Sequence, residues 1–446
     1  MAELTKKLQS IALQETLRYV GQNPAERIPK VFNLIKPFAQ LSHHKDYIVQ
    51  VEKALNDAEN NWKRLVERAF TQLSPTVLNK FVENFLLYAS LVGIPKQEEL
   101  AEKYDCNIPW AILMDPTTDC NLNCTGCWAG EYKRGDHLTF EELDNIIEQG
   151  KELGIYMYLY SGGEPLLRAQ DIVELARKHS DCIFCAFTNA TLVTPELAKQ
   201  LAEVGNVVLA ISVEGFDEVN DFRRGKGIYK RVVRAMDLLR EAGVGFGFST
   251  CYHRENTEAV ASEQFVDSMI EKGCFFGWYF TYMPLGKSAR TELLVTPEQR
   301  KLMYERIRGF RSSKDIFLID FWNDGEFVGG CIAGGRSYLH INAHGDVEPC
   351  AFIHYADTNI RQASLLEALQ SPLFRQYRQN QPFNENPLRP CPLLDNPDAL
   401  LNMVNAASAY STQRQDLEPV EVVTGKCRAA AAAWAGVADQ IWQESN

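Results

Sequence analysis

Three closely spaced cysteines are the residues of this chain best suited to chemistry. Cys120, Cys124 and Cys127 have the spacing C-x3-C-x2-C, and Trp128 follows the third. Soft thiolates bind zinc, copper(I) or iron–sulfur clusters. A structural zinc usually takes four ligands, whereas this loop offers three and the next histidine is His137. Three thiolates can hold three irons of a four-iron cluster and leave the fourth iron open to a ligand. A structural zinc or a chance spacing is the alternative.

Polar or backbone-exposing residues stand at the ends of the second, third and fourth predicted strands. In parallel α/β folds, ligands bind at the carboxyl ends of the strands. The cysteine loop follows the first predicted strand, so we expect the thiols and these strand-end residues on one face. The residues concerned are Gly162, Gly163, Glu164, Asn189, Ser212 and Glu214.

Residues 106–310 alternate between strand and helix patterns. Capping boxes at Thr139–Glu142 and Thr296–Gln299 start two of the helices, and Gly154 and Gly205 stand where helices should stop. Six strand–helix units predict an α/β fold with a parallel sheet, either a partial barrel or a doubly wound sheet. The predicted strands are Trp110–Met114, Ile155–Tyr160, Cys182–Thr188, Val207–Ser212, Gly245–Thr250 and Phe275–Tyr282, and Phe317–Asp320 could add one more.

The regions before and after residues 106–310 show different sequence patterns. Residues 1–105 show helical periodicity and no strand pattern, and prolines divide them into short helices. Residues 311–446 contain short strand patterns and Gly-rich turns, and end in an Ala-rich helix over Lys426–Gln443. We therefore predict three domains: an N-terminal helical domain (1–105), a barrel domain (106–310) and a C-terminal α+β domain (311–446).

The cysteine loop, its aromatic Trp128 and the later Gly-Gly-Glu-Pro at Gly162–Pro165 resemble the radical S-adenosylmethionine (SAM) superfamily over residues 108–290. The resemblance implies a partial (β/α)6 barrel in which Cys120, Cys124 and Cys127 bind a [4Fe–4S] cluster. The fourth iron would bind the amine and carboxylate of SAM. Gly162, Gly163 and Glu164 would line the methionine side, with Asn189 at the same rim. Ser212 and Glu214 would lie near the ribose or carboxylate, although the family often has Asp at the latter position. Arg223 either pairs with the SAM carboxylate or lies in a solvated turn.

The resemblance also implies a reaction. A low-potential cluster, reduced by a donor such as flavodoxin or ferredoxin, would cleave SAM to a 5′-deoxyadenosyl radical that abstracts hydrogen from a substrate. Positioning and water exclusion would then decide specificity, and the sequence names no general acid or base. The rival interpretation is a non-catalytic iron–sulfur or zinc protein. Such a carrier needs no pocket like the one that Gly162–Pro165 and Ser212–Gly215 suggest.

A second set of cysteines lies near the C-terminus. Cys331 and Cys350 have the spacing C-x13-G-x4-C, which resembles the start of the SPASM and twitch auxiliary-cluster domains. A full SPASM domain would continue with many cysteines, whereas only Cys391 and Cys427 follow here. The resemblance therefore implies one auxiliary [4Fe–4S] cluster, with Cys427 as fourth ligand. The alternatives are an open iron, completion by His340, His344 or His354, a structural zinc, or buried unligated thiols.

Bulk properties limit the partners. A formal net charge of −12 argues against nucleic acid. Twelve cysteines in 446 residues are too few for a disulfide scaffold, and the first residues lack a secretory signal pattern, so we predict a cytoplasmic protein. The apolar run Phe85–Ile94 is too short to span a bilayer, and we predict no transmembrane segment. The substrate is either a peptide side chain or a lipid or other hydrophobic small molecule, which that run could approach.

Overall fold

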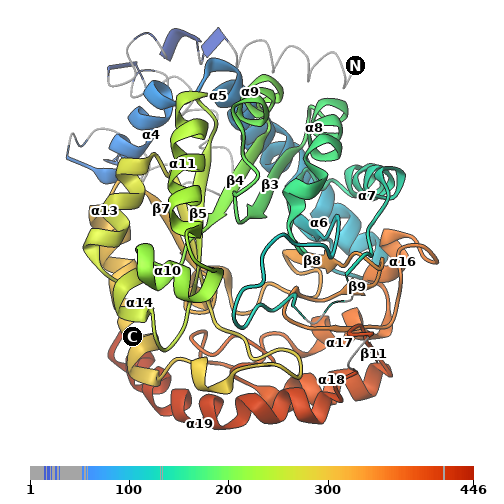
Figure 1. Cartoon of the computed structure of the whole chain (residues 1–446). Helices are drawn as coiled ribbons and strands as arrows, with labels where there is room; N and C mark the ends of the chain where they lie inside the picture. The colour runs from blue at the N-terminus through green and yellow to red at the C-terminus, as the bar shows by residue number, and fades with distance from the viewer. Residues whose placement is uncertain are drawn as a thin grey trace.

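The computed structural model describes a barrel of strands and helices with further helices at both ends (Figure 1). It describes residues 59–130, 132, 134–414 and 417–445, together with residues 15, 16, 18–20, 22, 26, 27, 30, 53, 54 and 57. Nine strands form one sheet in the order β7-β6-β5-β4-β3-β2-β1-β8-β9, and β10 and β11 form a separate pair. Strands β1 to β8 pair in parallel, whereas β8 with β9 is antiparallel. The predicted α/β partial barrel is confirmed.

The strands are β1 (Ala111–Met114), β2 (Met157–Tyr160), β3 (Ile183–Thr188), β4 (Val207–Ser212), β5 (Phe246–Tyr252), β6 (Phe276–Thr281), β7 (Phe317–Asp320), β8 (Tyr338–Ile341), β9 (Val347–Glu348), β10 (Tyr355–Ala356) and β11 (Tyr410–Ser411). The helices before β6 are α4 (Asn61–Gln72), α5 (Pro75–Val82), η1 (Glu83–Gly93), α6 (Ile94–Tyr104), α7 (Phe140–Glu152), η2 (Pro165–Arg168), α8 (Ala169–Lys178), α9 (Pro195–Val204), α10 (Asp217–Arg224), α11 (Ile228–Glu241), α12 (Thr257–Val260) and α13 (Glu263–Lys272). Those after β6 are η3 (Thr291–Leu293), α14 (Pro297–Ser313), α15 (Gly325–Val328), α16 (Leu365–Leu369), α17 (Pro372–Asn380), α18 (Pro397–Ala407) and α19 (Val420–Ser445).

Local sequence signals set the ends of the barrel helices. The capping boxes at Thr139 and Thr296 are both formed, because each hydroxyl accepts a backbone N–H while the third helical residue bonds back. Gly205 ends α9 with φ of +76°, a conformation that favours glycine. All seven strands predicted up to Asp320 are present, with shifts of at most two residues at their ends.

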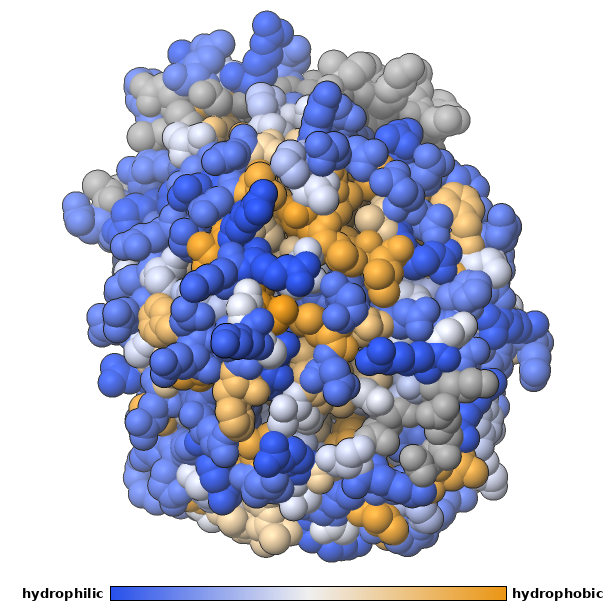
Figure 2. Space-filling view, viewed as in Figure 1, coloured by the Kyte–Doolittle hydropathy of each residue, from blue (hydrophilic) through white to orange (hydrophobic). Residues whose placement is uncertain are grey.

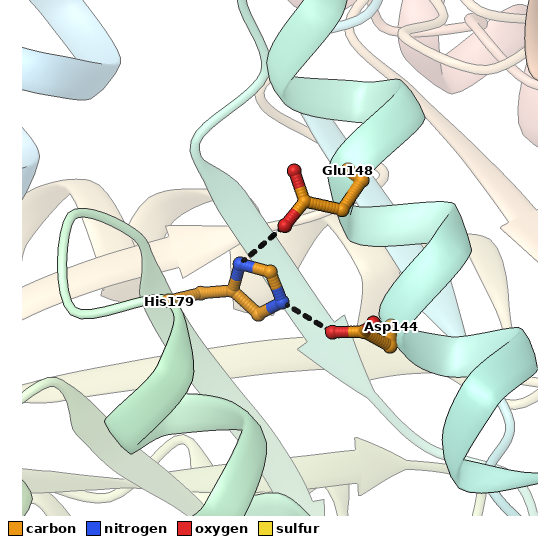
Figure 3. Close-up of side chains that lie close together, drawn as sticks. All are labelled: Asp144, Glu148 and His179. Atoms are coloured by element: carbon orange, nitrogen blue, oxygen red, sulfur yellow. Dashed lines mark hydrogen bonds and ion pairs between the residues drawn. The ribbon is translucent and has the colours of Figure 1, made fainter.

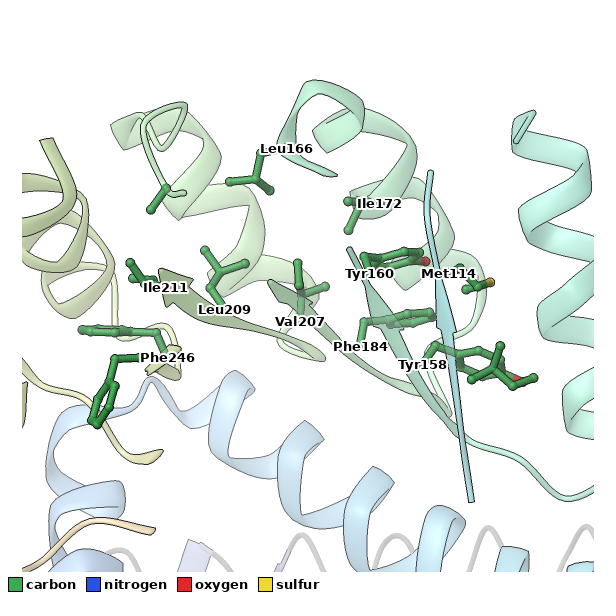
Figure 4. Packing of buried hydrophobic residues seen from close by; sticks show 14 of the residues in the cluster. Met114, Tyr158, Tyr160, Leu166, Ile172, Phe184, Val207, Leu209, Ile211 and Phe246 are labelled. Atoms are coloured by element: carbon green, nitrogen blue, oxygen red, sulfur yellow. The ribbon is translucent and has the colours of Figure 1, made fainter. Parts of the chain in front are cut away.

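The barrel strands place alternate side chains in two separate apolar cores. The outward-facing side chains pack beneath the helices, and Tyr160 stacks on Phe184 with ring centroids 5.8 Å apart (Figure 4). The inward-facing side chains include Leu113, Leu159 and Cys185, and join the core of the C-terminal region. The inward-facing core thus joins the barrel to the C-terminal region.

Figure 2 shows apolar side chains gathered between α11 and α8 on an otherwise hydrophilic face.

The helical stretch Pro75–Tyr104 packs against the strand ends opposite the cysteine loop. Asn84 Nδ2 donates to the carbonyl of Cys182 (2.6 Å), and Gln97 Nε2 to that of Gly154 (2.7 Å). Among the described residues this is the one helix long and apolar enough to cross a membrane, with 39% of its apolar window buried in the protein. The sequence predicted no membrane span here. The helical prediction for residues 1–58 falls mostly outside the described residues.

The C-terminal region continues the barrel sheet. Strand β8 lies beside β1, with Leu113 opposite His340, and β9 extends the sheet. Helices α17, α18 and α19 lie at the end of the molecule opposite α4 and α5 (Figure 1). The Ala-rich helix predicted from Lys426 to Gln443 is part of the longer α19. The domain boundaries at residues 105 and 310 stay predictions, and α14 runs across the second.

Candidate functional site

Two glycines after β2 let that loop approach the cysteine loop closely. The Gly163 N–H donates to the Thr117 carbonyl (2.9 Å), and a Cβ on Gly163 would lie 2.1 Å from the carbonyl oxygen of Asp119. Gly162 has φ of +92°, and its Cβ would meet Thr117 as well. Only glycine fits such an approach. The Gly162–Glu164 segment therefore lies directly against the residue preceding Cys120.

Glu164 joins the ends of β2 and β3. Its buried carboxylate accepts hydrogen bonds from Thr188 Oγ1 (2.6 Å), the Asn189 N–H (2.8 Å) and the Leu166 N–H (2.9 Å). Burial raises the pKa of Glu164, against the effect of these bonds. The side-chain Nδ2 of Asn189 donates to Asn121 Oδ1 (2.8 Å) and lies 4.0 Å from Cys120 Sγ. Glu164 and Asn189 thus position the cysteine loop from the side of β3.

Glu214 forms a buried ion cluster with two arginines. Its carboxylate lies 2.6 Å from Arg223 Nη1 and 2.5 Å from Arg224 Nη2, and it also accepts the Cys251 N–H (2.9 Å). Burial opposes ionisation of Glu214, but the two guanidinium groups outweigh it and lower its pKa. Arg223 is 6% exposed, so the solvated-turn alternative for it is wrong. Two cations on one carboxylate leave an excess positive charge at this site.

Arg223 also holds the cysteine loop. Its carbonyl accepts the Thr125 N–H (2.9 Å), and its Nη2 donates to the Gly126 carbonyl (3.4 Å). Burial opposes the charge on Arg223, yet the neighbouring Cys251, Glu214 and Cys124 raise its pKa. Within the part of the chain that the structure describes, its Nε finds no hydrogen-bond partner. The excess positive charge therefore lies beside the thiols, where an anionic ligand would be stabilised.

The three thiols of the loop suit a cluster better than a single ion. Burial raises the pKa of Cys120 to about 11 and also raises that of Cys127, with further contributions from the neighbouring thiols. The thiols are therefore close enough to disfavour one another's ionisation. A structural zinc usually takes four ligands, whereas three thiolates can hold three irons of a four-iron cluster, so the donor set fits a cluster.

Two further residues, Tyr282 and Cys251, lie at this face of the barrel. The Tyr282 ring packs over Gly126, where a Cβ would lie 2.7 Å from Tyr282 Cε2. Cys251 is the penultimate residue of β5, lies beside Glu214 and is partly exposed. Ser212, at the end of β4 and opposite Ser249, is also partly exposed. The sequence analysis singled out Arg223, but it did not reveal that Arg223 and Arg224 share Glu214. That pairing depends on a contact between α10 and the end of β4.

The second set of cysteines surrounds an aromatic cavity. Cys331, Cys350 and Cys391 line one cavity together with Phe321, Trp322, Tyr338, Phe352 and Tyr377. Tyr338 donates to Cys350 Sγ (2.6 Å), and the Leu394 N–H donates to Cys391 Sγ (3.3 Å). Burial raises the pKa of Cys350 to about 12 and that of Cys391 to about 11. Grouped sulfurs with N–H and O–H donors fit an iron–sulfur cluster.

The fourth cysteine comes from a distant element. Cys427 lies in α19, fully buried, and is not among the residues lining the cavity. Burial, followed by the neighbouring Cys391, raises the pKa of Cys427, so this thiol lies near Cys391. The histidines considered as alternative ligands contact other groups: His340 faces Asp115 and Glu348, His344 faces Asp136, and His354 bonds to Ala351 and Gln413.

A separate group of metal-ligating residues lies on the outer helices, away from both sets of cysteines. His179 is buried between Asp144 (2.8 Å from Nε2) and Glu148 (3.7 Å from Nδ1) (Figure 3). Lys178 Nζ lies 2.6 Å from Asp144. The two ring nitrogens of His179 face different carboxylates, and Lys178 already neutralises one of them. This group joins α7 to the end of α8 as an ion-paired contact.

Comparison with known proteins agrees with this geometry. Residues 114–264 match the profile of the radical SAM superfamily, and residues 331–392 match that of the SPASM iron–sulfur cluster-binding domain. The chain contains a radical SAM domain and a SPASM domain. These domains imply a [4Fe–4S] cluster, SAM and an auxiliary cluster, and the two sets of cysteines fit the two clusters. As predicted, the protein is a radical SAM enzyme.

The chain resembles several proteins along most of their length. It is 26% identical over 303 residues to an AdoMet-dependent heme synthase of Methanosarcina barkeri, covering 61% of this chain and 85% of that protein. It is 29% identical over 315 residues to the mycofactocin maturase MftC of Mycolicibacterium smegmatis, covering 66% and 78%. Streptococcus suis SuiB bound to its precursor peptide SuiA has the same fold, with a TM-score of 0.56 and 18% identity, covering 67% of this chain and 74% of that one.

Proposed function

We propose that this protein reductively cleaves SAM and uses the resulting 5′-deoxyadenosyl radical to abstract hydrogen from a substrate. The observation that carries the proposal is the meeting of three spaced thiols with a buried Glu214–Arg223–Arg224 cluster at the carboxyl ends of the strands. A protein that only carries electrons does not need charged side chains of this kind beside its thiols. When bound, the [4Fe–4S] cluster supplies one electron at low potential to the sulfonium of SAM.

Each residue of the site then has a role. Cys120, Cys124 and Cys127 hold the cluster. Arg223 is our choice for the carboxylate of SAM, because its guanidinium has a free Nε within the described part of the chain and lies beside the thiols. Glu214 holds both arginines in place.

The remaining strand-end residues divide into contacts and supports. The backbone of Gly162 and Gly163 and the hydroxyl of Ser212 are the proposed contacts to the methionine and ribose parts of SAM. Glu164 and Asn189 act through the loops that they join, since their polar atoms already bond within the protein.

We assign one auxiliary [4Fe–4S] cluster to Cys331, Cys350 and Cys391, with Cys427 as the fourth ligand. Its surroundings are apolar and aromatic, which suits a centre that accepts or relays an electron rather than one that binds a charged cosubstrate. This assignment leads us to propose an oxidative or bond-forming outcome. A cytoplasmic flavodoxin or ferredoxin is the proposed source of the first electron.

The interior of the barrel favours a substrate with an apolar or aromatic group. Along β6, the inward-facing Phe276, Trp278 and Phe280 are partly exposed, whereas the residues between them are buried. Phe187 stacks on Trp278 with centroids 4.9 Å apart. Relatives named as heme synthase and mycofactocin maturase offer both options, a hydrophobic small molecule and a peptide. We propose that the reacting part of the substrate is apolar in either case.

The test uses purified, anaerobically reconstituted protein with SAM and dithionite. We expect 5′-deoxyadenosine above the background of a variant with alanine at positions 120, 124 and 127. Full iron content without 5′-deoxyadenosine would favour the electron carrier. Metabolite and proteome comparison of cells with and without the protein would then separate a small-molecule substrate from a peptide.

A further inference from the structure

One buried histidine lies between the two sets of cysteines and contacts carboxylates from both sides. His340, in β8, places Nε2 3.0 Å from Asp115 Oδ1 and Nδ1 2.6 Å from Glu348 Oε2, and all three side chains are fully buried. The sheet order explains the geometry, because β8 lies between β1 and β9. Leu113 is opposite His340 on one side, and Glu348 is opposite it on the other.

Each carboxylate is close in sequence to a cluster ligand. Asp115 directly follows β1 and begins the loop that carries Cys120, whereas Glu348 is two residues before Cys350. Trp128, the residue after Cys127, also lies against this group, with its ring 6.0 Å from that of His340. The same indole lies 5.7 Å from Phe352, whose N–H donates to Cys350 Sγ. Both cluster loops therefore converge on one contact network.

Other side chains fix the ends of this network. Ser161 donates to Asp115 Oδ1 (2.7 Å), and Asn342 donates to Glu348 Oε1 (3.0 Å), which also accepts from Thr412. The two carboxylates outweigh the effect of burial and raise the pKa of His340 to about 10. A buried cation held by partners on both sides transmits a displacement of one loop to the other, because packed interiors do not deform continuously.

We propose that His340 is a positioning residue that couples the radical SAM site to the auxiliary site. This role rests on the proposed function, since it assumes a cluster at each set of cysteines. His340 touches neither cluster ligand nor, by our assignment, SAM. It acts by fixing the distance and orientation between the loop of Cys120 and the hairpin of Cys350. Losing it should therefore disturb both centres at once.

The test compares two buried histidines that each lie between two carboxylates. H340Q removes the coupling contact, and H179Q removes the contact to Asp144 and Glu148 on the outer helices, far from both sets of cysteines. Each variant is reconstituted as holoenzyme. Iron content, thermal unfolding, electron paramagnetic resonance spectra of the reduced clusters and the rate of SAM cleavage are then measured. T412V, which removes only one bond to Glu348, provides a milder variant should H340Q not fold.

We expect H340Q to alter the spectra of both clusters and to slow SAM cleavage about tenfold at unchanged iron content, as misplacement of reacting groups does. T412V should alter the spectra in the same way but less. H179Q should lower the unfolding temperature and leave both spectra unchanged. A change confined to the auxiliary cluster, or equal changes in H340Q and H179Q, would overturn the coupling role. Absence of 5′-deoxyadenosine from the unmodified protein would instead overturn the proposed function, and the spectra would still test His340.

Discussion

The two sets of cysteines are built in opposite ways. The first lies on one loop, is partly exposed, and has two arginines and a glutamate beside it. The second gathers Cys331, Cys350, Cys391 and Cys427 from distant segments into aromatic surroundings. Charged groups beside an accessible loop suit a centre that binds a charged cosubstrate. Aromatic walls around the sulfurs suit a centre that only exchanges electrons, so the difference supports the two roles that we propose.

The largest effect should come from removing the first set. Replacing Cys120, Cys124 and Cys127 by alanine should abolish SAM cleavage and remove about half of the iron, since each cluster takes its own thiolates. Iron analysis and quantification of 5′-deoxyadenosine provide the measurement. Residual cleavage at the unmodified rate would place the reactive centre elsewhere and break the comparison.

Removing the second set should separate SAM cleavage from the complete reaction. C331A/C350A should also lose about half of the iron but retain part of the SAM cleavage, because the first site is intact. C185S, a change at a buried thiol inside the barrel, serves as the control and should keep all the iron. Unchanged iron in C331A/C350A would remove the auxiliary cluster from our account. C427A tests the fourth ligand by the same analysis.

Removing the buried carboxylate at the first site should cost more than breaking an exposed ion pair elsewhere in the protein. Glu214→Ala leaves two arginines unpaired in a buried position, and we expect a loss of about 3–5 kcal/mol of unfolding free energy together with weaker SAM binding. Lys199→Ala breaks an exposed pair with Glu203 and should cost less than about 1 kcal/mol. Denaturant unfolding and SAM titration measure both. Equal losses in the two variants would contradict the role of Glu214.

The uncharged contact at the second site gives a smaller effect. Tyr338→Phe removes the hydroxyl that donates to Cys350 Sγ. A hydrogen bond to sulfur raises a cluster potential, so the variant should lower the auxiliary potential without changing the iron content or the rate of SAM cleavage. Spectroscopic redox titration detects the shift. A change in SAM cleavage of the size expected for Glu214→Ala would show that the two sites are not distinct.

The affinity of the thiols for metal should rise gradually with pH. Cys120 and Cys391 have pKa values of about 11, and Cys350 of about 12, so the metal-free thiols keep their protons near neutral pH. A metal must displace these protons. Affinity should therefore rise from about pH 6.5 to about pH 8.5, by about tenfold per pH unit for each proton released. Anaerobic cobalt titration measures the slope, and C331A/C350A should reduce it. A flat response would contradict protonated thiols.

Features with local causes could be predicted from the sequence. The cysteine spacing, the capping boxes at Thr139 and Thr296, and the polar residues at the strand ends depend on a few neighbouring residues, and the structure has the predicted strands and caps. The shared pairing of Arg223 and Arg224 with Glu214 was missed, since it needs α10 to fold back on β4. The role of His340 was also missed, because it requires the pairing of β1 with β8. Local sequence patterns do not indicate which distant strands pair in the sheet.

That pairing of β1 with β8 also has a consequence for biosynthesis. Chains emerge from the ribosome beginning at the N-terminus, so β1 is made long before Tyr338–Ile341. Until then one edge of β1 has no neighbour, and the carbonyls and amides that β8 will cover remain available to water. During this interval the loop of Cys120 lacks the contact that Asp115 makes with His340. The last part of the sheet to form is thus the part that joins the two sets of cysteines.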